Sequence, residues 1–271
     1  MDEHNHLPEI NQLSVLLSTI LLAYALTPFI NLSVANFNVR LPFGVFTFTI
    51  NFLTIVSILV AALAGFGINW LIHSHPHPQQ KVRIQYSLLP AMTAWVIGIP
   101  LNTLSYGVGW WVLFALGGVL LALVFVAEYI AVDFSDTRFG PAVGGLLALS
   151  LALFLILSIT IRAAGLRLYL ALPGLAILIF MISLRTLYLR SSGRWNWVAA
   201  LCISLVTVQI AVALQYLPVS PLGYGLYLVA PVYAMISLAV VVDERRPLRP
   251  ALAEPVIIMV ILLILAFLFG G

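Results

Sequence analysis

Charged residues are scarce in this sequence of 271 residues. Asp, Glu, Lys and Arg together make up 8% of the chain, whereas hydrophobic residues make up 63% of it. A water-soluble domain of this size cannot bury that much apolar surface. The shortage of charge therefore excludes a soluble globular fold and predicts that lipid surrounds most of the chain.

Cysteine and histidine are absent from the positions where a cofactor would need them. The one cysteine, Cys202, excludes an internal disulfide framework and a thiolate metal cluster built from this chain alone. The five histidines all lie outside the apolar segments, so the chain offers no helix-borne axial ligand for haem. The patterns HExxH, GxSxG and GxxxxGK are missing as well, which argues against the enzyme classes that carry them.

Long apolar runs are what the sequence has in abundance. A spanning helix needs about 20 mainly apolar residues, and we predict nine such spans. They are residues 10–32, 43–70, 86–105, 109–132, 142–162, 168–188, 196–216, 223–242 and 255–271. The runs are continuous and do not alternate between polar and apolar residues, so they indicate helices and not barrel strands.

The predicted fold is therefore an all-α polytopic transmembrane helical bundle, a single integral membrane domain over residues 1–271. The last span is only 17 residues long, near the lower limit for crossing a bilayer, so eight spans plus a short terminal helix is the alternative. The first span has no Lys or Arg before it and is longer than the apolar part of a signal peptide, so we expect it to stay in the chain.

The basic residues indicate an orientation. With a cytoplasmic N-terminus, nine of the twelve Lys and Arg residues lie on the cytoplasmic side and three, Arg40, Arg162 and Arg167, lie outside. Basic residues gather on the cytoplasmic side of membrane proteins. We therefore predict a multi-pass protein of the inner membrane with its C-terminus outside, and the net charge of +3 follows from this bias and does not indicate nucleic-acid binding.

Two short segments indicate a tandem repeat. The sequence PLNTLSYG from Pro100 precedes the fourth span, and PVSPLGYG from Pro218 precedes the eighth, with Pro, Leu, Tyr and Gly at equal offsets. Four spans separate the segments, so two copies would face the same way, as in parallel-repeat membrane proteins. The first copy would run to about residue 135 and the second from about 142 to 245, followed by the terminal helix 255–271. The alternative is that these residue types simply favour interfacial turns.

Histidines form one candidate metal site. The sequence HSHPHP places His73, His75 and His77 in one predicted cytoplasmic loop, and His4 and His6 lie on the same side of the membrane. Imidazole is a common ligand of zinc and other divalent metals. Two prolines in HSHPHP prevent a regular helix that would hold two ligands on one face. A solvated loop without any cofactor is therefore the stronger interpretation.

Polar residues inside the spans are the next candidates, because they are costly in hydrocarbon. Glu128 in the fourth span and Arg185 in the sixth lie at similar predicted depth near the cytoplasmic boundary, so we predict a structural ion pair. Asn51 in the second span and Gln209 in the seventh are predicted to make hydrogen bonds between helices. A gating role for the charges, or ligand binding by the amides, is the alternative.

The sequence DFSDTR contains the nearest approach to an enzyme motif. Asp133 and Asp136 could hold Mg²⁺ and a diphosphate, as in prenyl-transferring membrane enzymes. Such enzymes need a second acidic cluster, and the corresponding loop here, DERRPLRP, is mostly basic. Capping and charge balance are therefore the preferred interpretation of this pair.

Four stretches, AEYIAVD, AAGLRLYLALPGL, ISLRTLYLR and LPVSPLGYGL, resemble an uncharacterised multispanning family of Chloroflexota-type bacterial inner-membrane proteins. The resemblance implies a bacterial inner-membrane protein of unknown function and transfers no catalytic residue.

The function predicted from these features is a non-catalytic accessory or scaffold subunit that packs against membrane lipids and other integral membrane proteins. The alternative is a transporter of an apolar or lipid-like substrate, which the repeat favours. A membrane-embedded enzyme that uses Asp133 and Asp136 is the third candidate.

Overall fold

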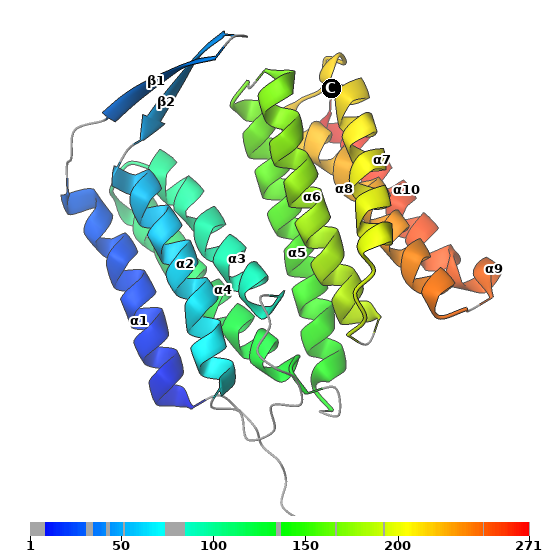
Figure 1. Ribbon diagram of the computed structural model, residues 1–271, viewed down its shortest axis with the longest axis horizontal. Coiled ribbons are helices and arrows are strands. Elements are labelled where there is room, and N and C mark those ends of the chain that lie inside the picture. Colours follow the sequence, from blue (N-terminus) through cyan, green and yellow to red (C-terminus); the bar gives the residue numbers. More distant parts are fainter. Residues whose placement is uncertain are drawn as a thin grey trace, which may run out of the picture. The chain divides into compact units, whose positions relative to one another are not determined.

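The computed structural model describes residues 9–30, 35–41, 44–50, 52–73, 85–133, 137–165, 167–191, 193–245 and 247–270. Within it the chain forms two compact units, Met1–Ala142 and Val143–Gly271. Each unit is built mainly from long helices (Figure 1).

The described residues of the first unit form four long helices and a β-hairpin. Helix α1 contacts α2 and α4, and α3 packs against both α2 and α4. The elements are α1 (Ile10–Leu26), the 3-10 turn η1 (Thr27–Phe29), β1 (Ala35–Leu41), β2 (Gly44–Ile50), α2 (Phe52–His73), α3 (Gln85–Thr103) and α4 (Val108–Ile130).

The hairpin corrects one predicted boundary. Strands β1 and β2 pair antiparallel, with Leu41 opposite Gly44 and Ala35 opposite Ile50, so the helix predicted from residue 43 begins only at Phe52. The sequence of β2, GVFTFTI, combines β-branched and aromatic residues in alternation, which favours a strand. Helix α2 still has 22 residues, enough to cross a bilayer.

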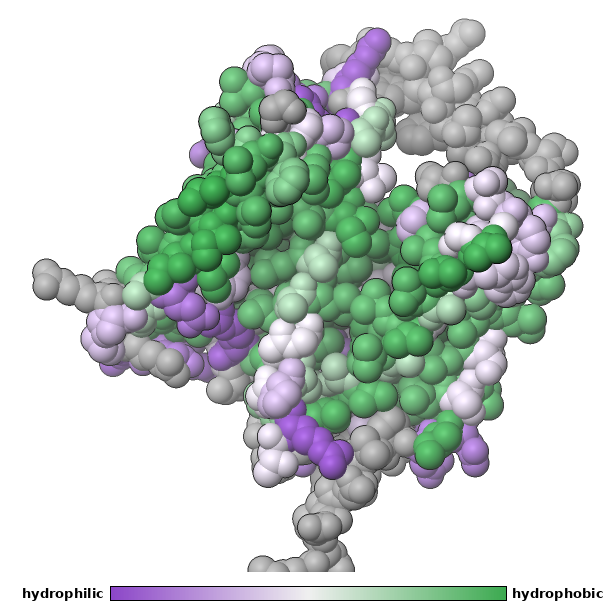
Figure 2. Space-filling view, turned by 180° about the vertical axis from the view of Figure 1, so that it is seen from behind, coloured by the Kyte–Doolittle hydropathy of each residue, from purple (hydrophilic) through white to green (hydrophobic). Residues whose placement is uncertain are grey.

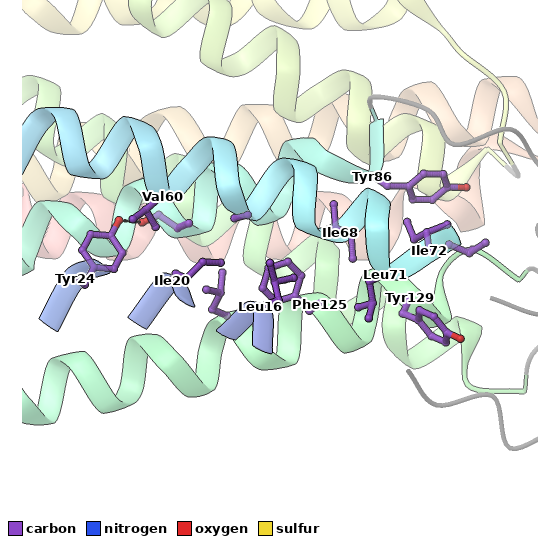
Figure 3. Close-up of a cluster of buried hydrophobic side chains, with 14 of the residues drawn as sticks. Leu16, Ile20, Tyr24, Val60, Ile68, Leu71, Ile72, Tyr86, Phe125 and Tyr129 are labelled. Carbon is purple, nitrogen blue, oxygen red and sulfur yellow. Dashed lines mark hydrogen bonds between the residues drawn. The ribbon is translucent and has the colours of Figure 1, made fainter. Parts of the chain in front are cut away.

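The core of the first unit is a column of apolar side chains between its helices (Figure 3). Ile20 of α1, Ile68 of α2 and Phe125 of α4 are all almost fully buried. Gly65 of α2 faces Ser87 and Ala91 of α3, and a Cβ at position 65 would lie 3.4 Å from the Cβ of Ser87, in van der Waals contact with it. Small residues permit such backbone approach in membrane helices.

The described residues of the second unit form four long helices, one short helix and a terminal apolar helix. Helix α6 packs against α7 and α8, α7 packs against α8, and α10 packs along α8. The elements are α5 (Phe139–Ala163), which begins just before the unit boundary, α6 (Leu168–Arg190), α7 (Trp197–Gln215), α8 (Pro221–Asp243), α9 (Leu248–Ala251) and α10 (Ala253–Phe269).

The helical membrane class is confirmed. Each predicted span overlaps one long helix, and in the described part of the chain seven of these helices are long and apolar enough to cross a membrane. Helix α3 is not among the seven and carries two internal prolines, and the apolar α10 has 17 residues. Figure 2 shows that hydrophobic residues cover most of the surface on the side in view, with hydrophilic residues in smaller groups.

Four prolines lie inside helices without interrupting them. Helix α3 runs through Pro90 and Pro100, α6 through Pro173, and α8 through Pro231. Broken helices near the midplane are common in transporters. The helices that carry these four prolines are instead continuous.

Candidate functional site

Glu128 and Arg185 are both buried. Glu128 lies near the end of α4 and is 0% exposed, and Arg185 lies near the end of α6 and is 1% exposed. The guanidinium of Arg185 also stands 5.7 Å from the ring centre of Tyr188 on the same helix. The two charges belong to different compact units, so their ion pair stays a prediction.

The predicted histidine metal site falls mostly outside the described residues. His4, His6, His75 and His77 lie there, whereas His73 ends α2 with its Nδ1 2.7 Å from the carbonyl oxygen of Asn69. Within the described part of the chain, no three His, Cys, Asp or Glu residues gather as a metal site. The metal site therefore stays a prediction.

The remaining polar candidates are also only partly described. Asp133 follows α4, and Asp136 lies outside the described residues, so the Mg²⁺ interpretation of this pair stays a prediction. Asn51 lies outside the described residues too. Gln209 is described, and it lies at an exposed position of α7.

The surface around Gln209 is one face of α7. Val198, Cys202, Leu205 and Gln209 follow each other at intervals of four, three and four residues, which places them on one side of a helix. All four are exposed, Val198 at 73% and Leu205 at 56%. We call these four residues the α7 face.

Gln209 is the polar member of the α7 face. It lies about 18 Å along the helix axis from Trp197 and about 9 Å from Gln215, given a rise of about 1.5 Å per residue. If the two ends of α7 lie at the two membrane boundaries, Gln209 is within the hydrocarbon region, where lipid tails offer its amide neither a donor nor an acceptor. A side chain from another helix would satisfy it.

A second polar feature lies where α7 begins and α8 ends. Arg194 donates from Nη2 to Oδ2 of Asp243 at 3.0 Å, and Asn196 caps α7 by accepting from the backbone N–H of Ala199. These residues and Arg245 line an open cavity of about 670 Å³. We call it the α7–α8 groove.

Tryptophans mark the depth of this groove. The rings of Trp195 and Trp197 stack with their centres 5.1 Å apart, and Trp195 also contacts Tyr188. Indole rings prefer the headgroup zone of a bilayer. By this preference, the α7–α8 groove is expected at the level of lipid headgroups.

Comparison with family models gives one match, to the family described as "Protein of unknown function (DUF5656)", over residues 32–269. The chain belongs to this family. No curated protein and no solved structure matches it. The match covers most of the DUF5656 chain, and it agrees with the predicted resemblance to an uncharacterised family.

Sequence analysis missed two polar contacts in this DUF5656 protein. The Tyr24 hydroxyl on α1 donates to the carbonyl oxygen of Ala94 on α3 at 2.5 Å and shares a hydrogen bond with Ser57 on α2 (Figure 3). Arg194 pairs with Asp243, which is 49 positions away. The hydroxyl of Tyr24 lies within an apolar run, which indicates that it needs a hydrogen-bond partner. The arginine-rich loop at Arg194 similarly indicates a need for an acidic partner.

Proposed function

We propose that this DUF5656 protein is a non-catalytic membrane scaffold whose α7 face packs against the α7 face of a second copy. The observation that carries the proposal is Gln209, an amide on a lipid-facing surface in the hydrocarbon region. The rest of the α7 face is apolar or, at Cys202, small. Such a surface suits close helix packing around one polar contact.

A second copy is the partner that fits best, for a geometric reason. All copies insert in the same orientation, so equal positions of α7 lie at equal depth in the membrane. A two-fold axis along the membrane normal would therefore place Gln209 opposite Gln209 of the other copy. The amide has both donors and an acceptor, so two of them can pair reciprocally.

Cys202 allows a direct test because it is the one cysteine of the chain and lies on the α7 face. In membranes that contain the full chain, a membrane-permeable oxidant should give a disulfide-linked dimer through Cys202. Gln209→Leu should reduce the dimer about threefold to twentyfold, since interhelical hydrogen bonds in membranes contribute about 0.6–1.7 kcal/mol. Gln209→Asn should retain part of the cross-link.

The matched control moves the cysteine to another exposed surface. In the background Cys202→Ala, the variant Val119→Cys places a thiol on α4, where Val119 is 60% exposed. This variant should give no dimer. The proposal is overturned if Cys202 gives no dimer, if Val119→Cys dimerises equally, or if Cys202 links to a different protein.

Transport of an apolar or lipid-like substrate is the second candidate, and the arrangement of helices supports it. In the first unit α4 packs against α1, α2 and α3, and in the second α8 packs against α6 and α7 and meets α5 at Gly225. The relations among the last three helices of each set are those expected of a tandem repeat, but α1 packs against α2, whereas the described residues show no comparable packing of α5 against α6. However, Tyr106 and Gly107 precede α4, whereas Tyr224 and Gly225 lie within α8, so the repeated motif occupies different structural positions.

Localisation is part of the same proposal. We place the protein in the inner membrane of a bacterium, as its resemblance to Chloroflexota-type inner-membrane proteins implies, with a cytoplasmic N-terminus. The support is the excess of arginine on the side assigned to the cytoplasm. The residues at or next to helix ends on that side include Arg138, Arg190, Arg194 and Arg245. Membrane lipids are then its constant partners.

A further inference from the structure

We propose that the α7–α8 groove binds the headgroup of an anionic glycerophospholipid, with the phosphate held by Arg194 and Arg245. The proposal is independent of self-association through the α7 face. It rests on the charge of the groove, its apolar wall and the backbone conformation of Arg245.

The charge of the groove favours an anion. Its lining holds two arginines and one carboxylate, so its formal charge is +1. Arg194 is 69% exposed, and its ion pair with Asp243 occupies one of the five N–H donors of a guanidinium. Guanidinium donors match the geometry of phosphate oxygens.

Arg245 carries the second observation. It follows the end of α8 with a φ of 53°, the left-handed region that a non-glycine residue rarely adopts, and its N–H donates to the carbonyl oxygen of Val242. Glycine is the usual residue at this position of a helix end. Arginine occupies a position where glycine would be less strained. This indicates that the arginine side chain has a function there.

The remaining wall explains why the anion is a lipid. Ala199 of α7 and Leu238, Ala239 and Val242 of α8 line the groove beside the arginines. Leu238 and Val242 lie one turn apart on α8 and are 40% and 59% exposed. An acyl chain can lie along this apolar wall while the phosphate reaches the arginines, whereas free phosphate would gain nothing from the wall.

The backbone at the start of α7 adds to the attraction. Asn196 caps the helix there, and the first turn of a helix has N–H groups without partners within the helix and a partial positive charge. The end of α8 has the opposite partial charge and carries Asp243, which pairs with Arg194. The groove thus combines fixed cations with apolar surface at headgroup depth.

Native mass spectrometry of the delipidated full chain in mild detergent tests the proposal. Dioleoyl phosphatidylglycerol should bind at least tenfold more tightly than dioleoyl phosphatidylcholine. Arg194→Gln and Arg245→Gln should each weaken phosphatidylglycerol binding about tenfold, the loss expected for one charge-assisted contact of about 1.4 kcal/mol. Arg167→Gln, at an exposed position before α6, is the matched control and should leave binding unchanged.

Arg245→Gly separates binding from folding. Glycine adopts the left-handed conformation without a steric penalty, so the melting temperature should be unchanged or higher while phosphatidylglycerol binding falls about tenfold. Inorganic phosphate at millimolar concentration should not displace the lipid. The proposal is overturned if the groove variants bind like the wild type, if Arg167→Gln weakens binding as much, or if inorganic phosphate competes fully.

Discussion

At the scale of single residues, buried charge is the most demanding feature of this chain. Glu128 and Arg185 are the two charged residues that are fully buried in the described part of the chain. A charge taken out of water needs an opposite charge or several hydrogen bonds, because desolvation costs several kcal/mol per ion. Both positions could be identified from the sequence, since each charge interrupts the end of an apolar run.

The predicted ion pair has a direct test. Glu128→Gln or Arg185→Gln alone should lower the free energy of unfolding by about 3–5 kcal/mol, because the remaining charge stays buried. The double variant Glu128→Arg with Arg185→Glu should recover much of this loss. Fluorescence-detected size exclusion and thermal unfolding in detergent measure both effects.

Arg167→Gln serves as the control for this series. Arg167 is exposed, so its replacement should leave the free energy of unfolding unchanged. If the single and double variants accumulate in the membrane to the same extent, Glu128 and Arg185 are not paired.

Other residue contacts could not be read from the sequence. Arg194 and Asp243 lie at the ends of different helices, and only the packing of α7 on α8 brings them within 3.0 Å. The hydrogen bond from Tyr24 to a backbone carbonyl of α3 depends likewise on the tertiary approach of α1 and α3. Side-chain types suggest which residues need partners, but they do not select the partner.

At the scale of elements, the contact of α8 with α10 shows how close packing holds a short apolar helix. Ser220 donates from Oγ to the carbonyl oxygen of Phe269 at 2.7 Å, and its backbone N–H donates to Gly270 at 3.1 Å. A Cβ at Gly223 would lie 2.5 Å from the Cα of Gly270. Only glycine at position 223 allows this approach without a shift of backbone.

Gly223→Ala should therefore lower the free energy of unfolding by about 1–3 kcal/mol, the usual cost of overpacking. Gly144→Ala on α5 is the matched control, since a Cβ there has no neighbour within 4 Å. It should leave stability unchanged or raise it by about 0.5–1 kcal/mol, because alanine favours a helix over glycine. Thermal unfolding in detergent compares the two, and equal effects would contradict the close contact.

The elements themselves were largely predictable from the sequence, with one exception. Lipid requires each span to satisfy its own backbone hydrogen bonds, so long apolar runs indicate helices reliably. The hairpin from Ala35 to Ile50 was missed because its second strand is as apolar as a span. Its alternation of Val, Thr and Phe was the signal for a strand, and the adjoining apolar run of α2 concealed it.

At the scale of the whole molecule, the topology depends on α3. This helix has 19 residues, is interrupted by neither of its prolines, and is less apolar than the seven clear spans. If α3 crosses the membrane, the nine-span topology places most of the basic loops together on the cytoplasmic side. If it does not cross, every later loop changes sides, and the α7–α8 groove moves to the opposite face.

Reporter fusions decide between these arrangements. In the nine-span topology, a reporter after Lys81 should be cytoplasmic, whereas reporters after Tyr106 and after Ser220 should both be outside, because α3 separates the first two positions. Alkaline phosphatase is active only outside and green fluorescent protein fluoresces only inside, so paired fusions at each position control for expression. If Lys81 and Tyr106 report the same compartment, α3 does not span, and Ser220 should then share that compartment as well.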